Sequence, residues 1–136
     1  MIRRLSDSGH FKLFRGEVTS AEMLSHQYIR FCPTDAWRPN INMYETREAF
    51  IICVDLAGMK PDAINLEYGD GAVILRGERL PPAPSGASED IGVQLMEIDS
   101  GQFCRQVDLP APVERDRMTA SYRDGILWIT LVKAQA

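Results

Sequence analysis

The stretch that decides the fold runs from residue 49 to residue 78 and reads AFIICVDLAGMKPDAINLEYGDGAVILRGE. It begins with a nearly continuous apolar run, Ala49–Leu56, which has the length of one buried strand. Ile64, Leu66 and Tyr68 then alternate with polar residues at the two-residue period of a half-buried strand. A Gly-Asp-Gly turn joins this run to Ala72–Glu78, so the stretch predicts a β-hairpin beside a buried strand.

Further short strands are predicted on both sides of this stretch. Asn42–Glu45 has the pattern of a short edge strand, and a final hairpin joins Met118–Tyr122 to Ile126–Val132. The last of these runs, ILWITLV, is apolar on both faces, which predicts a central and buried strand. Two more extended runs are expected at Val93–Ser100 and Gln102–Leu109. Because no helical pattern lies between these runs, they predict an all-β sandwich of two sheets.

Two segments do not fit the strand pattern. Between Arg79 and Gly92 the chain is rich in proline and small polar residues, and a loop of this length in a compact domain usually has a function. Residues 1–36 form a separate N-terminal arm, in which Thr19 and Glu22 have the spacing of a capping box and predict a short helix that ends before Pro33. We expect this arm to be partly helical and weakly ordered.

The overall composition excludes several classes of function. The formal net charge is −4 and the basic residues are scattered, which disfavours nucleic-acid binding. No apolar stretch approaches the roughly 20 residues that span a bilayer, and the N-terminus lacks the apolar segment of a signal peptide. We therefore expect a cytoplasmic protein with no membrane span.

The side chains that could carry chemistry are few. Cys32, Cys53 and Cys104 are an odd number without a C-x-x-C pair, which favours buried or half-buried thiols over a disulfide framework or a zinc site. The two histidines lie in the arm with no third ligand nearby. Glu97 and Asp99 could be a carboxylate pair but fit better as one solvated strand face. We expect no catalytic residue, no metal and no cofactor, and hence no enzyme.

The chain from Trp37 to Lys133 resembles the α-crystallin domain of small heat shock proteins, especially the bacterial type. The resemblance rests on these residues in this order: Trp37-Arg38-Pro39, Tyr44-Glu45, Val54–Met59, Asp62–Ile64, Leu75–Arg79, Gly101–Arg105, Leu109-Pro110, Ala120 and Gly125–Leu127. It implies an immunoglobulin-like β-sandwich that acts as an ATP-independent holdase. It divides the chain into an arm (1–36), an α-crystallin domain (37–133) and a short C-terminal remnant (134–136).

The resemblance also implies how the subunits pair. Members of the family usually pass the long mid-domain loop to a neighbouring subunit, and here that loop would be Arg79–Gly92. Arg105 takes the position of the family's structural arginine, although a solvated strand arginine is the alternative. We expect Arg105, Glu97, Arg79 and Leu80 to contribute to the dimer or to its structural support.

The expected apolar binding surfaces are a groove and the arm. By resemblance, the groove lies beside Ile64, Leu66 and Tyr68, and we expect no tail to fill it because the sequence ends without the family's I-x-I motif. This ending favours a homodimer or small oligomer over a large assembly. In the arm, apolar side chains could bind clients or be buried in the protein's own dimer, and the candidates are Phe11, Phe14, Leu24, Tyr28 and Phe31.

These observations predict a chaperone that holds partly unfolded proteins in solution and keeps them available to ATP-dependent chaperones. The alternative is an interaction module that binds one dedicated partner or a longer paralogue. The lack of the tail motif favours the alternative, whereas the apolar arm favours the holdase.

Overall fold

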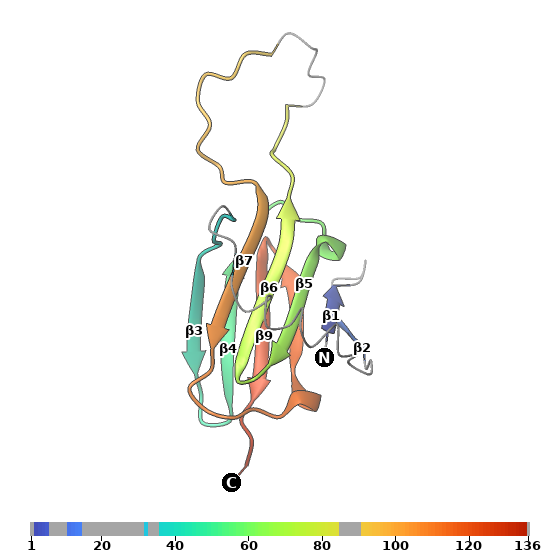
Figure 1. The fold of residues 1–136 in the computed structure, drawn as a ribbon, viewed down its shortest axis with the longest axis vertical. Helices are drawn as coiled ribbons and strands as arrows, with labels where there is room; N and C mark the ends of the chain where they lie inside the picture. The colour runs from blue at the N-terminus through green and yellow to red at the C-terminus, as the bar shows by residue number, and fades with distance from the viewer. Residues whose placement is uncertain (1, 6–10, 15–31, 33–35, 85–90, 136) are drawn as a thin grey trace.

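The computed structural model describes residues 2–5, 11–14, 32, 36–84 and 91–135, and these form two antiparallel sheets packed face to face (Figure 1). The first sheet has the strand order β2 (Phe11–Phe14), β1 (Ile2–Leu5), β5 (Ile64–Gly69), β6 (Ala72–Arg79), β7 (Gly101–Asp108). The second has the order β3 (Ile41–Glu45), β4 (Ala49–Asp55), β9 (Ile126–Val132), β8 (Thr119–Arg123). Two 3₁₀ turns, η1 (Pro61–Ala63) and η2 (Arg115–Arg117), complete the described elements. The predicted all-β sandwich is confirmed.

Tight Asp-Gly turns close the two predicted hairpins. In the β5–β6 turn Asp70 and Gly71 have φ angles of 50° and 77°, and in the β8–β9 turn Asp124 and Gly125 have φ angles of 52° and 78°. Successive residues with positive φ give a turn whose twist matches that of the strands it joins, and Asp followed by Gly tolerates this conformation well. These turns set the registers Tyr68↔Val73 and Tyr122↔Leu127.

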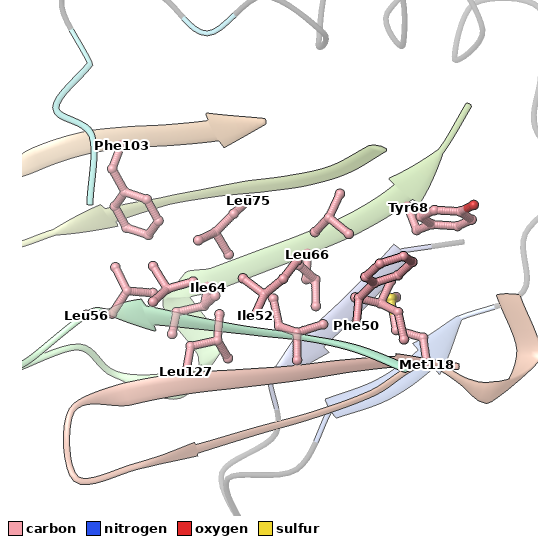
Figure 2. Close-up of a cluster of buried hydrophobic side chains, with 14 of the residues drawn as sticks. Phe50, Ile52, Leu56, Ile64, Leu66, Tyr68, Leu75, Phe103, Met118 and Leu127 are labelled. Carbon is pink, nitrogen blue, oxygen red and sulfur yellow. The ribbon is translucent and has the colours of Figure 1, made fainter. Parts of the chain in front are cut away.

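The hydrophobic core lies between the two sheets (Figure 2). Alternate residues of each strand point inward because side chains alternate across a strand. The inward residues of β5 are Ile64, Leu66 and Tyr68, and those of β4 are Phe50, Ile52 and Val54; all are buried. Phe103 of β7 fills one end of the core, beside Leu56 and Leu75.

The expectation that β9 is buried on both faces is only half right. β9 is central in its sheet, between β4 and β8, and Leu127, Ile129 and Leu131 are buried. Ile126 and Trp128, on the other face, are half-buried because this is the outer face of a two-layer sandwich. Apolar residues on both faces of this run therefore indicate a central strand, but no third layer of structure covers its outer face in the described chain.

The expected strand at Val93–Ser100 is not formed. These residues make no ladder with another described strand, and they extend away from the sandwich as part of a long loop (Figure 1). A strand needs a neighbour to accept its backbone hydrogen bonds, and the described part of this single chain offers none there. The predicted arm helix lies outside the described residues; the described residues of the arm are 2–5 and 11–14, which pair as β1 and β2, together with Cys32 and Ala36. None of the described helical turns is long or apolar enough to cross a membrane.

The expectation that the cysteines are buried free thiols was wrong for two of them. Cys32 and Cys104 form a disulfide with a Cα–Cα distance of 5.3 Å, whereas Cys53 is free and half-buried. The bond joins residues 72 positions apart, so sequence spacing gave no sign of it. Trp37 forms a parallel bridge to Phe103 of the same strand, so Cys32 and Trp37 both lie beside β7, the last strand of its sheet.

Gly77 is required by close packing, which leads to a stability prediction. A Cβ added there would collide with the carbonyl oxygen of Ala63 and would lie 2.5 Å from Cζ of Phe103. We expect Gly77→Ala to lower the free energy of unfolding by about 1–3 kcal/mol, measured by urea unfolding, because overpacking forces neighbouring atoms to move. Gly69→Ala is the matched control, since nothing lies within 4 Å of its added Cβ. Equal stability of the two variants would contradict the packing shown here.

Candidate functional site

The mid-domain loop, residues 80–100, carries the largest exposed apolar surface of the described chain. Leu95 is 77% exposed and Leu80 is 70% exposed. The other large apolar side chains of this loop are also exposed, and they are Ile91, Val93, Met96 and Ile98. Pro81 and Pro82 from one leg of the loop and Leu95, Met96 and Ile98 from the other line a cavity of about 130 Å³. Apolar surface gathered in one exposed segment usually marks an interaction site.

Arg79 fixes the base of this loop. Its Nε donates a hydrogen bond to the carbonyl oxygen of Asp99 (3.0 Å), Nη2 donates to the same oxygen, and Nη1 donates to the carbonyl oxygen of Ala57 (3.3 Å). The guanidinium carbon lies 4.2 Å from the centroid of the Trp37 ring, a cation–π contact. Because Arg79 precedes the loop and Asp99 lies near its end, these bonds hold the two ends of the loop together.

Trp37 completes the base of the loop. Its indole Nε1 donates a hydrogen bond to the carbonyl oxygen of Gly101 (3.0 Å). The centroids of the Trp37 and Phe103 rings lie 5.3 Å apart. Sequence patterning did not show that Trp37 and Arg79 act together, because they are far apart along the chain.

Arg105 is held in a partly buried position on β7. Its Nη1 donates a hydrogen bond to the carbonyl oxygen of Pro39 (2.7 Å), whereas its Nε is buried and has no hydrogen-bond partner among the described residues. Burial and the nearby charge of Arg38 lower the pKa of Arg105, yet a guanidinium stays protonated at neutral pH. No carboxylate of the described chain forms an ion pair with it. The Arg105 guanidinium can therefore still form an ion pair with a carboxylate of another molecule.

The strand β3 provides an open sheet edge on the other sheet. Among the described strands it pairs with β4 alone, and Met43 and Tyr44 on it are 41% and 50% exposed. An edge strand presents backbone N–H and C=O groups that can pair with another extended segment. This edge can accept a strand from a second molecule.

The three residues expected to line a groove lie on β5. Ile64, Leu66 and Tyr68 point into the core, and β5 is not an open edge because β1 pairs with it in antiparallel fashion. β2, the second strand of the hairpin, lies beside β8 of the opposite sheet. The hairpin therefore lies along the side of the sandwich where the groove was expected.

The other predicted residues are distributed over several places. Leu80 and Glu97 are exposed on the mid-domain loop, and Arg105 lies on β7 without a described contact to either. Phe11 and Phe14 belong to β2, while Leu24, Tyr28 and Phe31 lie outside the described residues. Within the described ranges, His, Cys, Asp and Glu side chains form no group that could hold a metal ion.

Comparison with known proteins agrees with this architecture. Residues 42–136 match the model of the Hsp20/alpha crystallin family. The "19.0 kDa class II heat shock protein" of Oryza sativa subsp. japonica is 34% identical over 88 residues, which are 62% of this chain and 50% of the rice protein, so the chain spans about half the length of that relative. A structure of heat shock protein 16.0 from Schizosaccharomyces pombe is 26% identical with a TM-score of 0.64, covering 74% of this chain and 93% of that one.

A second solved structure agrees with the first. The small heat-shock protein from Xylella fastidiosa, described as having a distinct high order structure, is 29% identical with a TM-score of 0.62, covering 74% of this chain and 89% of that one. The family model matches well over half of the 136 residues, and it includes both sheets apart from β1, β2 and the first residue of β3. The chain therefore belongs to the Hsp20/alpha crystallin family, the small heat shock proteins.

Proposed function

We propose that this protein is an ATP-independent holdase that binds partly unfolded proteins and prevents their aggregation. Members of its family are chaperones and not enzymes. The observation that carries the proposal is the exposed apolar surface of the mid-domain loop, with Leu95 at 77% and Met96 at 69% exposure. We place it in the cytosol, where ATP-dependent chaperones would receive the clients.

The binding follows from the hydrophobic effect. A partly unfolded protein exposes apolar segments, and burying one large apolar side chain contributes roughly 1.5–3 kcal/mol. The loop presents such side chains on a segment that makes no ladder with the described strands, so it can adapt to many different clients. Burial of apolar surface is favourable by itself, so the holding step needs no energy source.

The test of this proposal is the formation of soluble complexes. A model protein heated with the chain in the absence of ATP is expected to co-elute with it in size-exclusion chromatography. A variant with Leu95→Ser and Met96→Ser should recover less of the heated protein, while Gln94→Ser, at an exposed polar position of the same loop, serves as the control. A heated model protein that precipitates completely, leaving the chain alone in solution, would contradict the holdase.

The alternative function remains a module that binds one dedicated partner or a longer paralogue. The open β3 edge favours it, because edge pairing by backbone hydrogen bonds suits one defined extended segment. Affinity capture from heat-stressed cells separates the two: the holdase gives many substoichiometric proteins, and the dedicated module gives one stoichiometric partner.

We infer further that, when no client is bound, two copies pair through the mid-domain loop and the β3 edge, so that pairing and client binding compete for the same loop. The loop has extended, exposed residues without a strand partner, and β3 has a free edge with exposed Met43 and Tyr44. Glu97 on the loop is exposed, and Arg105 has a buried Nε without a described hydrogen-bond partner. We propose that Glu97 of one copy pairs with Arg105 of the other, which would compensate that buried charge.

A double-mutant cycle tests this pairing. Glu97→Gln and Arg105→Gln are each expected to raise the dimer Kd about tenfold, and the double variant is expected to be no weaker than either single variant. Sedimentation equilibrium measures the Kd, and urea unfolding controls for loss of the Arg105–Pro39 hydrogen bond within one subunit. Fully additive effects would show that the two side chains do not interact.

A further inference from the structure

A row of polar side chains crosses the outer face of the first sheet, the sheet nearer the viewer in Figure 1, beside the Cys32–Cys104 disulfide. The neighbours of Asn65 along β5 point into the core, so Asn65 points to the outer face. Arg76 of β6 lies directly opposite Asn65 on one side and directly opposite Cys104 of β7 on the other. Directly opposite residues of antiparallel strands share a face, so these three side chains lie next to one another.

A pocket of about 400 Å³ lies along this row. Its volume is within the roughly 300–1,000 Å³ that small-molecule sites have. The lining carries one guanidinium, one carboxylate and two side-chain amides, and the lining residues that matter here are Asn65, Arg76, Glu78, Gln102, Cys104 and Ala36. A guanidinium can bind a carboxylate through two parallel hydrogen bonds, and a carboxylate can bind an ammonium group. The pocket therefore suits a small polar molecule that carries both a carboxylate and an ammonium group.

The disulfide beside this pocket is easier to attack at Cys32 than at Cys104. Cys32 is half-buried, whereas Cys104 is only 2% exposed. Thiol–disulfide exchange requires access of a thiolate to one sulfur, and it is faster when the departing thiolate is stabilised. A neighbouring guanidinium stabilises a thiolate, and Arg76 lies directly opposite Cys104. Access and charge therefore both favour attack on Cys32 with Cys104 as the leaving group.

We propose that this pocket binds an acidic thiol peptide of the glutathione type and that Cys32 is the residue that the peptide modifies. The peptide thiol loses its proton to solvent, and its sulfur forms a bond with Sγ of Cys32. The bond between Cys32 and Cys104 breaks, and its electron pair stays on Sγ of Cys104 as a thiolate. The products are a mixed disulfide at Cys32 and a free Cys104, so the step consumes no other oxidant or reductant.

The bound peptide reaches the pocket from Cys32. The Cα atoms of Cys32 and Cys104 are 5.3 Å apart, and Cys104 lines the pocket. A three-residue peptide spans roughly 10 Å when extended, which is enough to place its charged groups among the lining side chains. Its carboxylates pair with Arg76 and its ammonium group pairs with Glu78. The exchange also cuts the covalent tie between Cys32 and β7.

The first test measures the equilibrium of the mixed disulfide at Cys32. In the full chain with Cys53→Ser and Cys104→Ser, Cys32 is the one remaining thiol. This chain is equilibrated with reduced and oxidised glutathione and, separately, with 2-mercaptoethanol and its disulfide, which carry no charge. Intact-mass spectrometry gives the modified fraction, and an unstructured peptide with one cysteine gives the reference for each thiol. Relative to that reference, we expect the equilibrium constant for glutathione to be at least about fivefold larger than for 2-mercaptoethanol.

A pair of variants shows whether the pocket causes this preference. Arg76→Gln should remove most of the preference for glutathione, while Arg123→Gln, on β8 of the opposite sheet, is the matched control and should keep it. Urea unfolding confirms that each variant is folded. Equal equilibrium constants for the two thiols, or a preference that a folded Arg76→Gln variant retains, would overturn the proposal.

The second test uses the unsubstituted, oxidised chain and therefore does not depend on the folding of any variant. S-Methylglutathione has the charged groups of glutathione but cannot exchange with a disulfide. At millimolar concentration we expect it to shift the amide NMR signals of residues 76–78 and 102–104, which line the pocket, and to leave those of β3 and β9 unchanged. Esterification of its carboxylates should reduce the shifts. No shifts, or shifts spread evenly over both sheets, would overturn the proposal. Neither test depends on holdase activity.

Discussion

Reduction of the Cys32–Cys104 disulfide is expected to lower the free energy of unfolding by about 4 kcal/mol. The bond closes a loop between residues 72 positions apart, and a cross-link over a loop of this size removes much of the conformational freedom of the unfolded chain. In the folded state it ties the arm to β7 next to the Trp37–Phe103 contact. Loss of the bond therefore acts mainly by giving the unfolded chain more conformational freedom, while the sandwich core of the folded chain stays intact.

The measurement is urea unfolding of the oxidised chain, the reduced chain and the variant Cys32→Ser. The reduced chain and Cys32→Ser should unfold at the same lower midpoint, and a reductant should leave Cys32→Ser unchanged. Cys32 is the better position for substitution because it is half-buried, whereas Cys104 is buried at 2% exposure. If the reductant lowered the unfolding midpoint of the unsubstituted chain and of Cys32→Ser equally, the effect would come from Cys53 or from the reagent, and not from the Cys32–Cys104 bond. In a reducing cytosol the domain would depend on its core alone.

Phe103→Ala is expected to lower the free energy of unfolding by about 3–5 kcal/mol, the usual range for removing a buried phenylalanine. Phe103 is 2% exposed, packs against Trp37 and lies over Gly77. Its removal opens a cavity at the end of the core where the mid-domain loop is anchored. We therefore expect proteolysis within residues 80–100 to become faster in the same variant.

Gln102→Ala is the matched control for this substitution. Gln102 is the preceding residue of β7 and is exposed, so its truncation should change stability by less than about 0.5 kcal/mol. Urea unfolding gives the free energy, and limited proteolysis followed by mass spectrometry gives the rate in the loop. If Phe103→Ala were as stable as Gln102→Ala, the core described here would be wrong at that end.

Much of the sandwich could be predicted because its signals are local. The alternation at Ile64, Leu66 and Tyr68 reports which face is buried, and the Asp-Gly turns report where the chain reverses. Each signal spans fewer than about ten residues, the length of one strand or turn. Strand positions were accordingly correct to within about one residue for β3 to β9.

The features that escaped prediction depend on contacts between distant parts of the chain. The disulfide needs Cys32 and Cys104 to meet, and the covering of β5 needs the first residues of the chain to pair with Asn65–Glu67. Ile2–Leu5 has no two-residue alternation, so its sequence did not indicate a strand. Val93–Ser100 shows the opposite error: an extended pattern formed no strand because no described neighbour pairs with it.

The central claim, that this chain holds unfolding proteins by exposed apolar surface, is tested most directly by light scattering. A model protein is heated to its aggregation temperature with an equimolar amount of the chain and no ATP, in parallel with the Leu95→Ser and Met96→Ser variant. We predict that the chain suppresses the scattering and that the variant suppresses it less. Scattering that rises as fast with the chain as without it would contradict the claim.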